Sequence, residues 1–80
     1  MKLHVVYTED AVLLSKRSDL SGSELQALIP GYKASLGPWD LNEVVEYLGD
    51  EYQGLEPAAS EQVESFVQSQ ASIQELTFRA

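Results

Sequence analysis

The sequence predicts a small α+β domain in which a three-stranded antiparallel sheet carries three helices on one face, in the order ββαααβ. The two ends of the chain alternate with a period of two, which is typical of strands. Two helix-capping motifs lie between these ends. The length of 80 residues suits a single domain with a thin core, so we treat residues 1–80 as one domain.

The first two strands are expected to form a β-hairpin. In residues 2–8 a strand would place Leu3, Val5 and Tyr7 on one face, and in residues 11–17 it would place Val12 and Leu14 on the face opposite to Leu13. Glu9 and Asp10, between the two runs, are expected to form a tight turn. The hairpin supplies two of the three strands of the predicted sheet.

A short helix is expected after the hairpin. Ser21 and Glu24 have the spacing of a capping box, and apolar side chains recur at helical spacing after them. Pro30 and Gly31 end this helix, because proline cannot continue the backbone hydrogen bonds. Residues 33–38 are expected to form a connecting loop.

The second helix has the strongest pattern in the chain. Asp40 is expected to cap it, with Glu43 at the third helical position. Its apolar positions follow one stripe: Leu41, Val44, Val45 and Leu48. We therefore expect Val44 and Leu48 to be buried, and three carboxylates to be exposed on another face: Glu43, Glu46 and Asp50.

A third helix and a final strand complete the predicted fold. The helix is expected over roughly residues 57–71, with Glu61 and Glu64 on its exposed side. Residues 73–79 alternate again and are rich in strand-forming side chains. This last strand is expected to return to the sheet beside the first one.

Charge is divided very unevenly along the chain. The net charge is −8, and residues 1–33 contribute nothing to it, because their four acids and four bases cancel. Residues 34–80 hold nine acids and one base, Arg79. Such a surface repels nucleic acids and anionic lipids and attracts basic partners, although acidity can also serve solubility alone.

The sequence lacks the residue sets of common enzymes and metal sites. It has no cysteine and a single histidine, His4, so it cannot build an ordinary zinc site, and a Ser-His-Asp triad around a strand histidine is disfavoured. The glycines are scattered and form no phosphate-binding loop. We expect no enzymatic activity, no catalytic residues, no metal and no cofactor.

The apolar segments predict a cytoplasmic protein. The longest apolar runs, such as residues 11–14, are far too short to span a bilayer. Glu9 and Asp10 follow the start of the chain too closely for a secretory signal. Membrane binding and direct nucleic-acid binding are therefore not expected.

The preferred hypothesis is a small inhibitor or binding protein that presents carboxylates to a basic, nucleic-acid-binding partner. Carboxylates three or four residues apart on a helix stand about 5–6 Å apart, which a phosphate-binding groove can accept in place of nucleic acid. The candidate partner-binding residues are Asp40, Glu43, Glu46, Tyr47, Asp50, Glu51, Glu61 and Glu64. In size and acidity, though in no motif, the chain resembles phage-encoded inhibitors of CRISPR or restriction complexes.

Two other functions share these features. An immunity or antitoxin protein that caps a basic toxin would use the same electrostatic steering. An acyl-carrier-like protein would need an attachment serine before an acidic helix, and Ser35 is the candidate, although Ala34 replaces the aspartate of the carrier motif. The aromatic residues are candidates either for the core or for partner contact: Tyr32, Trp39, Tyr47 and Tyr52.

Overall fold

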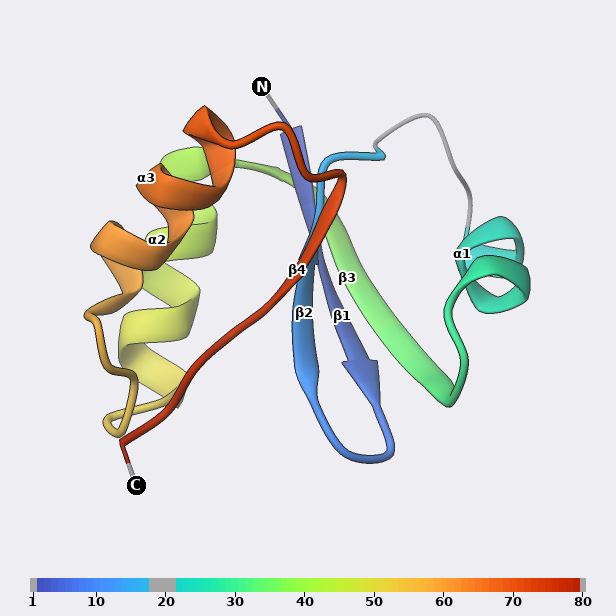
Figure 1. The fold of residues 1–80 in the computed structure, drawn as a ribbon, viewed down its shortest axis with the longest axis horizontal. Coiled ribbons are helices and arrows are strands. Elements are labelled where there is room, and N and C mark those ends of the chain that lie inside the picture. The colour runs from blue at the N-terminus through green and yellow to red at the C-terminus, as the bar shows by residue number, and fades with distance from the viewer. Residues whose placement is uncertain (1, 18–21, 80) are drawn as a thin grey trace.

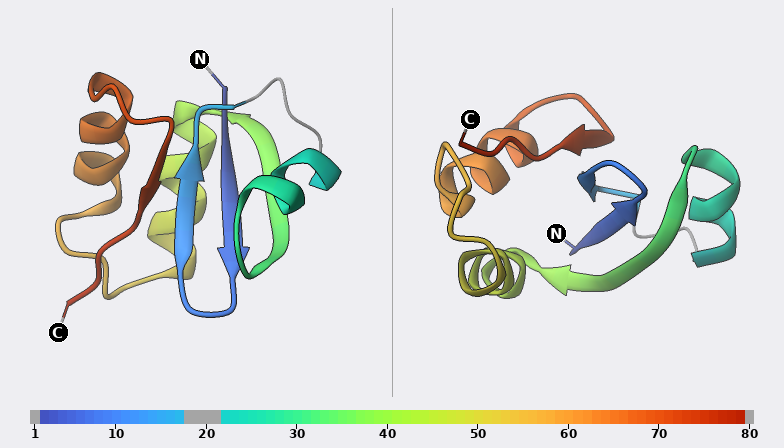
Figure 2. Two further views of the ribbon diagram at one scale, coloured as in Figure 1. Left: turned by 45° about the vertical axis from the view of Figure 1, so that its right-hand side comes forward. Right: turned by 90° about the horizontal axis from the view of Figure 1, so that it is seen from below.

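The computed structural model describes residues 2–17 and 22–79. Its helices lie on both sides of one sheet (Figure 1). The elements are β1 (Lys2–Thr8), β2 (Val12–Ser15), α1 (Gly22–Leu28), β3 (Tyr32–Asp40), α2 (Leu41–Glu51), α3 (Ala59–Gln68) and β4 (Ile73–Glu75). Figure 2 shows α2 and α3 together on one side and α1 on the other. The predicted α+β class, with an antiparallel sheet and three helices, is confirmed.

The sheet has four strands in the order β3-β1-β2-β4, where three strands were expected. β1 and β2 form the predicted hairpin, with Val5 opposite Leu14. β3 pairs antiparallel with the other side of β1, so the place beside the first strand is taken. The last strand, β4, therefore pairs with β2, with Gln74 opposite Leu14, and the expected return beside β1 is wrong.

The prediction of a loop over residues 33–38 is also wrong, because these residues lie within β3. An edge strand tolerates Pro38, since the backbone N–H that proline lacks is not needed on the outer side. Gly37 has φ +108°, and a Cβ there would lie 2.6 Å from the carbonyl oxygen of Leu3. The pairing with β1 is irregular at this point, between Leu3 and Val5. The two residues that suggested a loop thus permit an irregular edge strand.

Two separate cores explain why the helices lie on both faces. The larger core lies between the sheet and α2 and α3, and its buried residues are Leu3, Val5, Leu14, Val44, Leu48, Ala59, Val63, Phe66 and Leu76. The smaller core joins Val6 of β1 to Leu25 and Ile29 beside α1. The expectation of all helices on one face is wrong because β1 carries apolar side chains on both faces, and both need cover.

The helices begin close to their predicted positions. The Asp40 N–H donates a hydrogen bond to Glu43 Oε1 over 3.1 Å at the start of α2. Val44 and Leu48 are fully buried, as predicted. The predicted cap of α1, Ser21, lies outside the described residues.

The last third of the chain is less regular than predicted. Helix α3 is shorter than residues 57–71, and the Ser69 hydroxyl donates to the carbonyl of Phe66 where the helix ends. β4 stops at Glu75 instead of Arg79. The amide of the buried Gln62 exchanges hydrogen bonds of 2.9 Å with both the N–H and the carbonyl of Thr77. The Gln62 side chain thus satisfies the backbone N–H and carbonyl of Thr77, which would bond to a neighbouring strand if β4 were longer.

Candidate functional site

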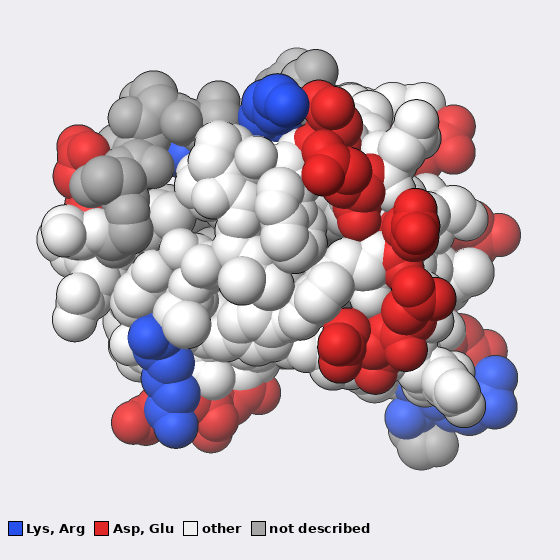
Figure 3. Space-filling view, turned by 180° about the vertical axis from the view of Figure 1, so that it is seen from behind, with Lys and Arg blue, Asp and Glu red and all other residues white. Residues whose placement is uncertain are grey.

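Exposed carboxylates gather on the face of the molecule that carries α2. Figure 3 shows a column of acidic side chains down this side, with a basic side chain at its top. We call the exposed acids at the start and along the length of α2 the acidic face: Asp40, Glu43, Glu46, Asp50 and Glu51. Lys2 Nζ lies 2.9 Å from Asp40 Oδ1, so Asp40 is already paired within the chain.

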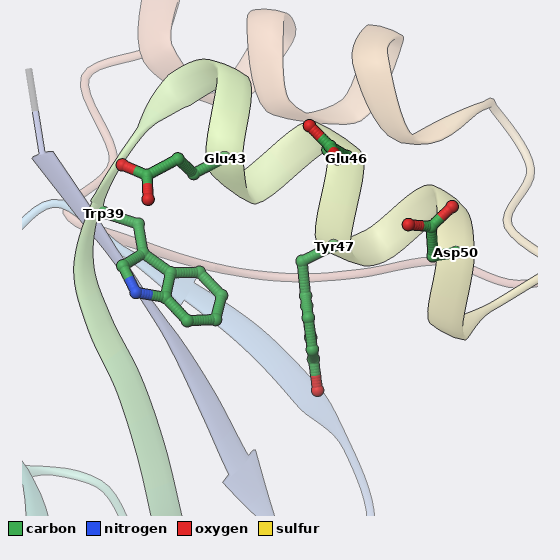
Figure 4. A pocket seen from close by; sticks show the side chains of 5 residues that line it. All are labelled: Trp39, Glu43, Glu46, Tyr47 and Asp50. Atoms are coloured by element: carbon green, nitrogen blue, oxygen red, sulfur yellow. The ribbon is translucent and has the colours of Figure 1, made fainter.

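An aromatic hollow opens within the acidic face (Figure 4). It has a volume of about 310 Å³ and is lined by Trp39, Glu43, Glu46, Tyr47 and Asp50. Trp39 comes from the end of β3 and Tyr47 from the middle of α2. Their ring centroids are 5.2 Å apart and the ring planes meet at 63°, so the two rings form a corner below the carboxylates.

The position of Tyr47 is fixed from beneath by the sheet. Its hydroxyl hydrogen-bonds to the hydroxyl of Tyr7 on β1. Burial raises the pKa of the Tyr7 phenol well above its ordinary value, and the hydrogen bond with Tyr47 raises this pKa further. The Tyr7 phenol therefore keeps its proton to a higher pH than an ordinary tyrosine does.

A second hollow, the interhelical groove, lies between α2 and α3. It has a volume of about 480 Å³ and is lined by Leu41, Asn42, Val45, Glu46, Ser60, Val63, Glu64, Val67 and Gln68. Glu46 borders both this groove and the aromatic hollow. The groove brings Glu64 of α3 near the acidic face, on the opposite helix from Glu46.

The structure groups some of the predicted partner-binding residues and separates others. Glu43, Glu46, Tyr47 and Asp50 line one hollow. Glu64 borders the interhelical groove, whereas Glu51 and Glu61 are exposed but line neither hollow. All of the predicted carboxylates are exposed.

Trp39 belongs to the site, but the sequence offered it only as a candidate for the core or for partner contact, outside the set of predicted partner-binding residues. It is half-buried and packs against the larger core as well as lining the aromatic hollow. Its position directly before the helix cap Asp40 is the sequence signal that places it beside α2. The signal was incomplete because residues 33–38 were expected to be a loop, so the position of Trp39 on an edge strand was not predicted.

Two residues were considered for other functions: His4 for a catalytic triad and Ser35 for carrier attachment. His4 is buried on β1, and Ser35 lies within β3 with its hydroxyl 2.7 Å from that of Tyr32. Residues 2–17 and 22–79 contain no group of three or more His, Asp or Glu side chains arranged to hold a metal ion. None of the helices in the same residues has the length and apolar character needed to cross a membrane.

No known protein family, curated protein or solved structure matches this chain. Its function is therefore inferred from the chemistry of the acidic face and of the aromatic hollow.

Proposed function

We propose that this protein is a small binding protein that presents carboxylates to a basic partner and blocks the partner's nucleic-acid site. The observation that carries the proposal is the row of Glu43, Glu46 and Asp50 along one exposed side of α2. None of these three carboxylates forms an ion pair with a described residue. They are therefore available to cations from outside the chain.

The spacing of the row suits a site that binds phosphates. An α-helix rises about 1.5 Å per residue, so steps of three and four residues separate the carboxylates by about 4.5 and 6 Å along the axis. Side chains at these steps share one helix face. A groove whose lysines and arginines neutralise successive phosphates can accept such a row of negative charges in their place.

The charge of the whole chain supports the same function. Between Lys33 and Arg79 the sequence has no basic side chain, and the net charge is −8. A concentration of one sign of charge increases the association rate with an oppositely charged partner. Exposed carboxylates contribute little to folding, so their alignment is not required by the core.

The test is a triple variant, Glu43→Gln, Glu46→Gln and Asp50→Asn, beside a control with the same change of charge elsewhere. The control is Glu9→Gln, Asp10→Asn and Glu75→Gln, three exposed acids outside both hollows. Each protein is immobilised, proteins captured from a cell lysate are identified, and the affinity of each purified partner is measured at low and moderate salt, with and without duplex DNA.

We expect the wild type and the control to capture a basic nucleic-acid-binding protein whose binding weakens with salt and with competing DNA. The triple variant should lose most of this affinity and keep the melting temperature of the wild type. Equal affinity of the triple variant and the control would contradict the proposal. A partner whose binding is indifferent to DNA would contradict the blocked nucleic-acid site.

A further inference from the structure

We propose that the aromatic hollow binds one arginine side chain of the partner, with the guanidinium against the rings of Trp39 and Tyr47 and its N–H groups directed at the surrounding carboxylates. This inference rests on the proposed function and specifies the contact at its centre. It is carried by the combination, in one hollow, of two aromatic rings and three carboxylates.

The two rings offer a surface to which cations are attracted. The face of an aromatic ring is electrostatically negative, and tryptophan attracts cations most strongly. Figure 4 shows the flat face of Trp39 turned toward the viewer, with Tyr47 beside it seen edge-on. Because the planes meet at 63°, a group placed in the corner contacts both rings. Both side chains are half-buried, so part of each ring remains accessible.

The carboxylates stand on the helix side of the same corner. Glu43, Glu46 and Asp50 follow one another along α2 above the two rings (Figure 4). The Glu43 carboxylate is oriented by the N–H of Asp40, and a carboxylate can accept several donors at once. A ligand in the hollow thus meets aromatic surface on one side and negative charge on the other.

Arginine fits this combination better than lysine. A guanidinium is planar and weakly hydrated, so it stacks on a ring while its N–H groups stay free at the edge of the plane. These five donors can reach more than one carboxylate, and a bidentate contact adds geometric specificity. A lysine ammonium is a strongly hydrated point charge that loses more hydration in such a hollow.

Contacts within the chain hold both rings of the hollow in place. Tyr47 is held by its hydrogen bond to Tyr7, and Trp39 is held by β3, where it stands opposite Leu3 of β1. Neither ring has to be ordered when the ligand arrives, which lowers the entropic cost of binding.

The chain provides its own reporter for the experiment, because Trp39 is the only tryptophan. Three end-blocked pentapeptides, uncharged apart from the central residue, are titrated into the ¹⁵N-labelled protein, with arginine, lysine or citrulline at the centre. Citrulline is the neutral analogue of arginine. The Trp39 indole N–H resonance and the backbone amides of α2 report on binding.

We expect the arginine peptide to shift the Trp39 resonance in a saturable way, and the lysine and citrulline peptides to bind more weakly.

The Tyr47→Leu variant should bind the arginine peptide about two- to fivefold more weakly, as expected for an exposed cation–π contact. Tyr47→Phe is the matched comparison, because it keeps the ring and removes only the hydrogen bond to Tyr7; its loss of affinity should be smaller than that of Tyr47→Leu. Glu46→Gln with Asp50→Asn should weaken binding, whereas Glu61→Gln, outside the hollow, should not.

Equal binding of the arginine and citrulline peptides would overturn the inference, and so would binding that leaves the Trp39 resonance unchanged. Equal binding of lysine and arginine would overturn the choice of arginine. If Tyr47→Leu does not fold, the pair Glu46→Gln and Asp50→Asn decides the result. The two proposals fail separately: a partner whose affinity depends on the carboxylates but not on the rings would refute the arginine contact and leave the acidic face as its binding surface.

Discussion

At the scale of single residues, His4 has the surroundings least suited to its chemistry. It is only 4% exposed, and neither of its ring nitrogens has a hydrogen-bond partner among the described residues. It lies on the same face of β1 as Val6, the β1 residue of the smaller core. A buried polar group without a partner costs about 1–3 kcal/mol of stability.

We therefore expect His4→Leu to raise the free energy of unfolding by about 1 kcal/mol, because leucine fills similar space without ring nitrogens that need hydrogen bonds. Urea unfolding followed by circular dichroism measures the change. Val6→Ala is the comparison on the same face, and it should be destabilising, since Val6 is fully buried. A large loss of stability in His4→Leu would show that the imidazole makes a contact that stabilises the fold.

Tyr7 is the second residue with an unusual environment, and it gives a pH-dependent prediction. Its folded-state pKa is raised, first by burial and then by the hydrogen bond to Tyr47. Above an ordinary tyrosine pKa of about 10, the unfolded chain loses this proton while the folded chain keeps it. The unfolded state then binds fewer protons, so stability is fully present below pH 10 and falls as the pH rises further.

We expect the free energy of unfolding to fall less steeply above pH 10 in Tyr7→Phe than in the wild type. Urea unfolding at a series of pH values from 8 upward measures the slope. Tyr32→Phe serves as the control, because it removes a different phenol and keeps Tyr7. Identical alkaline slopes in the wild type and Tyr7→Phe would show that Tyr7 is not the group responsible.

At the scale of elements, β3 departs most from what the sequence predicts. The local signals of Gly37 and Pro38 are those of a loop, and only the pairing with β1 makes the segment a strand. By contrast, α2 follows from local pattern alone, because its cap and its apolar stripe agree. A strong local sequence pattern therefore determines α2, whereas long-range strand pairing determines β3.

Two glycines test this description of the elements. Gly37→Ala should destabilise the protein by about 1–3 kcal/mol, because φ is +108° and the new Cβ would press against the Leu3 carbonyl oxygen. Gly49→Ala in α2 is the matched change at an open position, with nothing within 4 Å of the new Cβ, and should stabilise by about 0.5–1 kcal/mol. Thermal melting of both variants measures the two effects. Shifts of the same sign would contradict this assignment of strain to Gly37.

The candidate site was predictable only where it lies on one helix. The exposed side of α2 follows from helical periodicity, which gave Glu43, Glu46 and Asp50. The aromatic hollow requires Trp39 from the end of β3, and no local pattern fixed the path of that strand. Likewise, the approach of Glu64 to the acidic face depends on how α3 packs against α2. Sites that combine several elements need the tertiary structure.

At the scale of the whole molecule, the sheet separates two cores of very different size. The larger joins the sheet to α2 and α3, whereas the smaller holds α1 by Leu25 and Ile29. Leu28, at the end of α1, is 56% exposed. Local opening requires less free energy where fewer apolar groups are buried, so α1 should open before the rest of the fold.

Hydrogen exchange tests this order with two equivalent amides. The Ile29 N–H bonds the Leu25 carbonyl at the end of α1, and the Tyr52 N–H bonds the Leu48 carbonyl at the end of α2, both over 2.9 Å. We expect the Ile29 amide to exchange with a lower opening free energy than the Tyr52 amide, as measured by native-state exchange in low urea. Equal protection would show that the two cores unfold as one unit.

The irregular course of β3 also bears on how other chains can approach the protein. A free sheet edge invites edge-to-edge pairing and aggregation, and proteins discourage this with proline, lysine and irregular pairing at the outer strand. β3 carries Pro38 and an exposed Lys33, and its pairing with β1 is interrupted. Strand addition along the β3 edge is therefore disfavoured, so a partner that docks at this edge must recognise side chains rather than unpaired backbone.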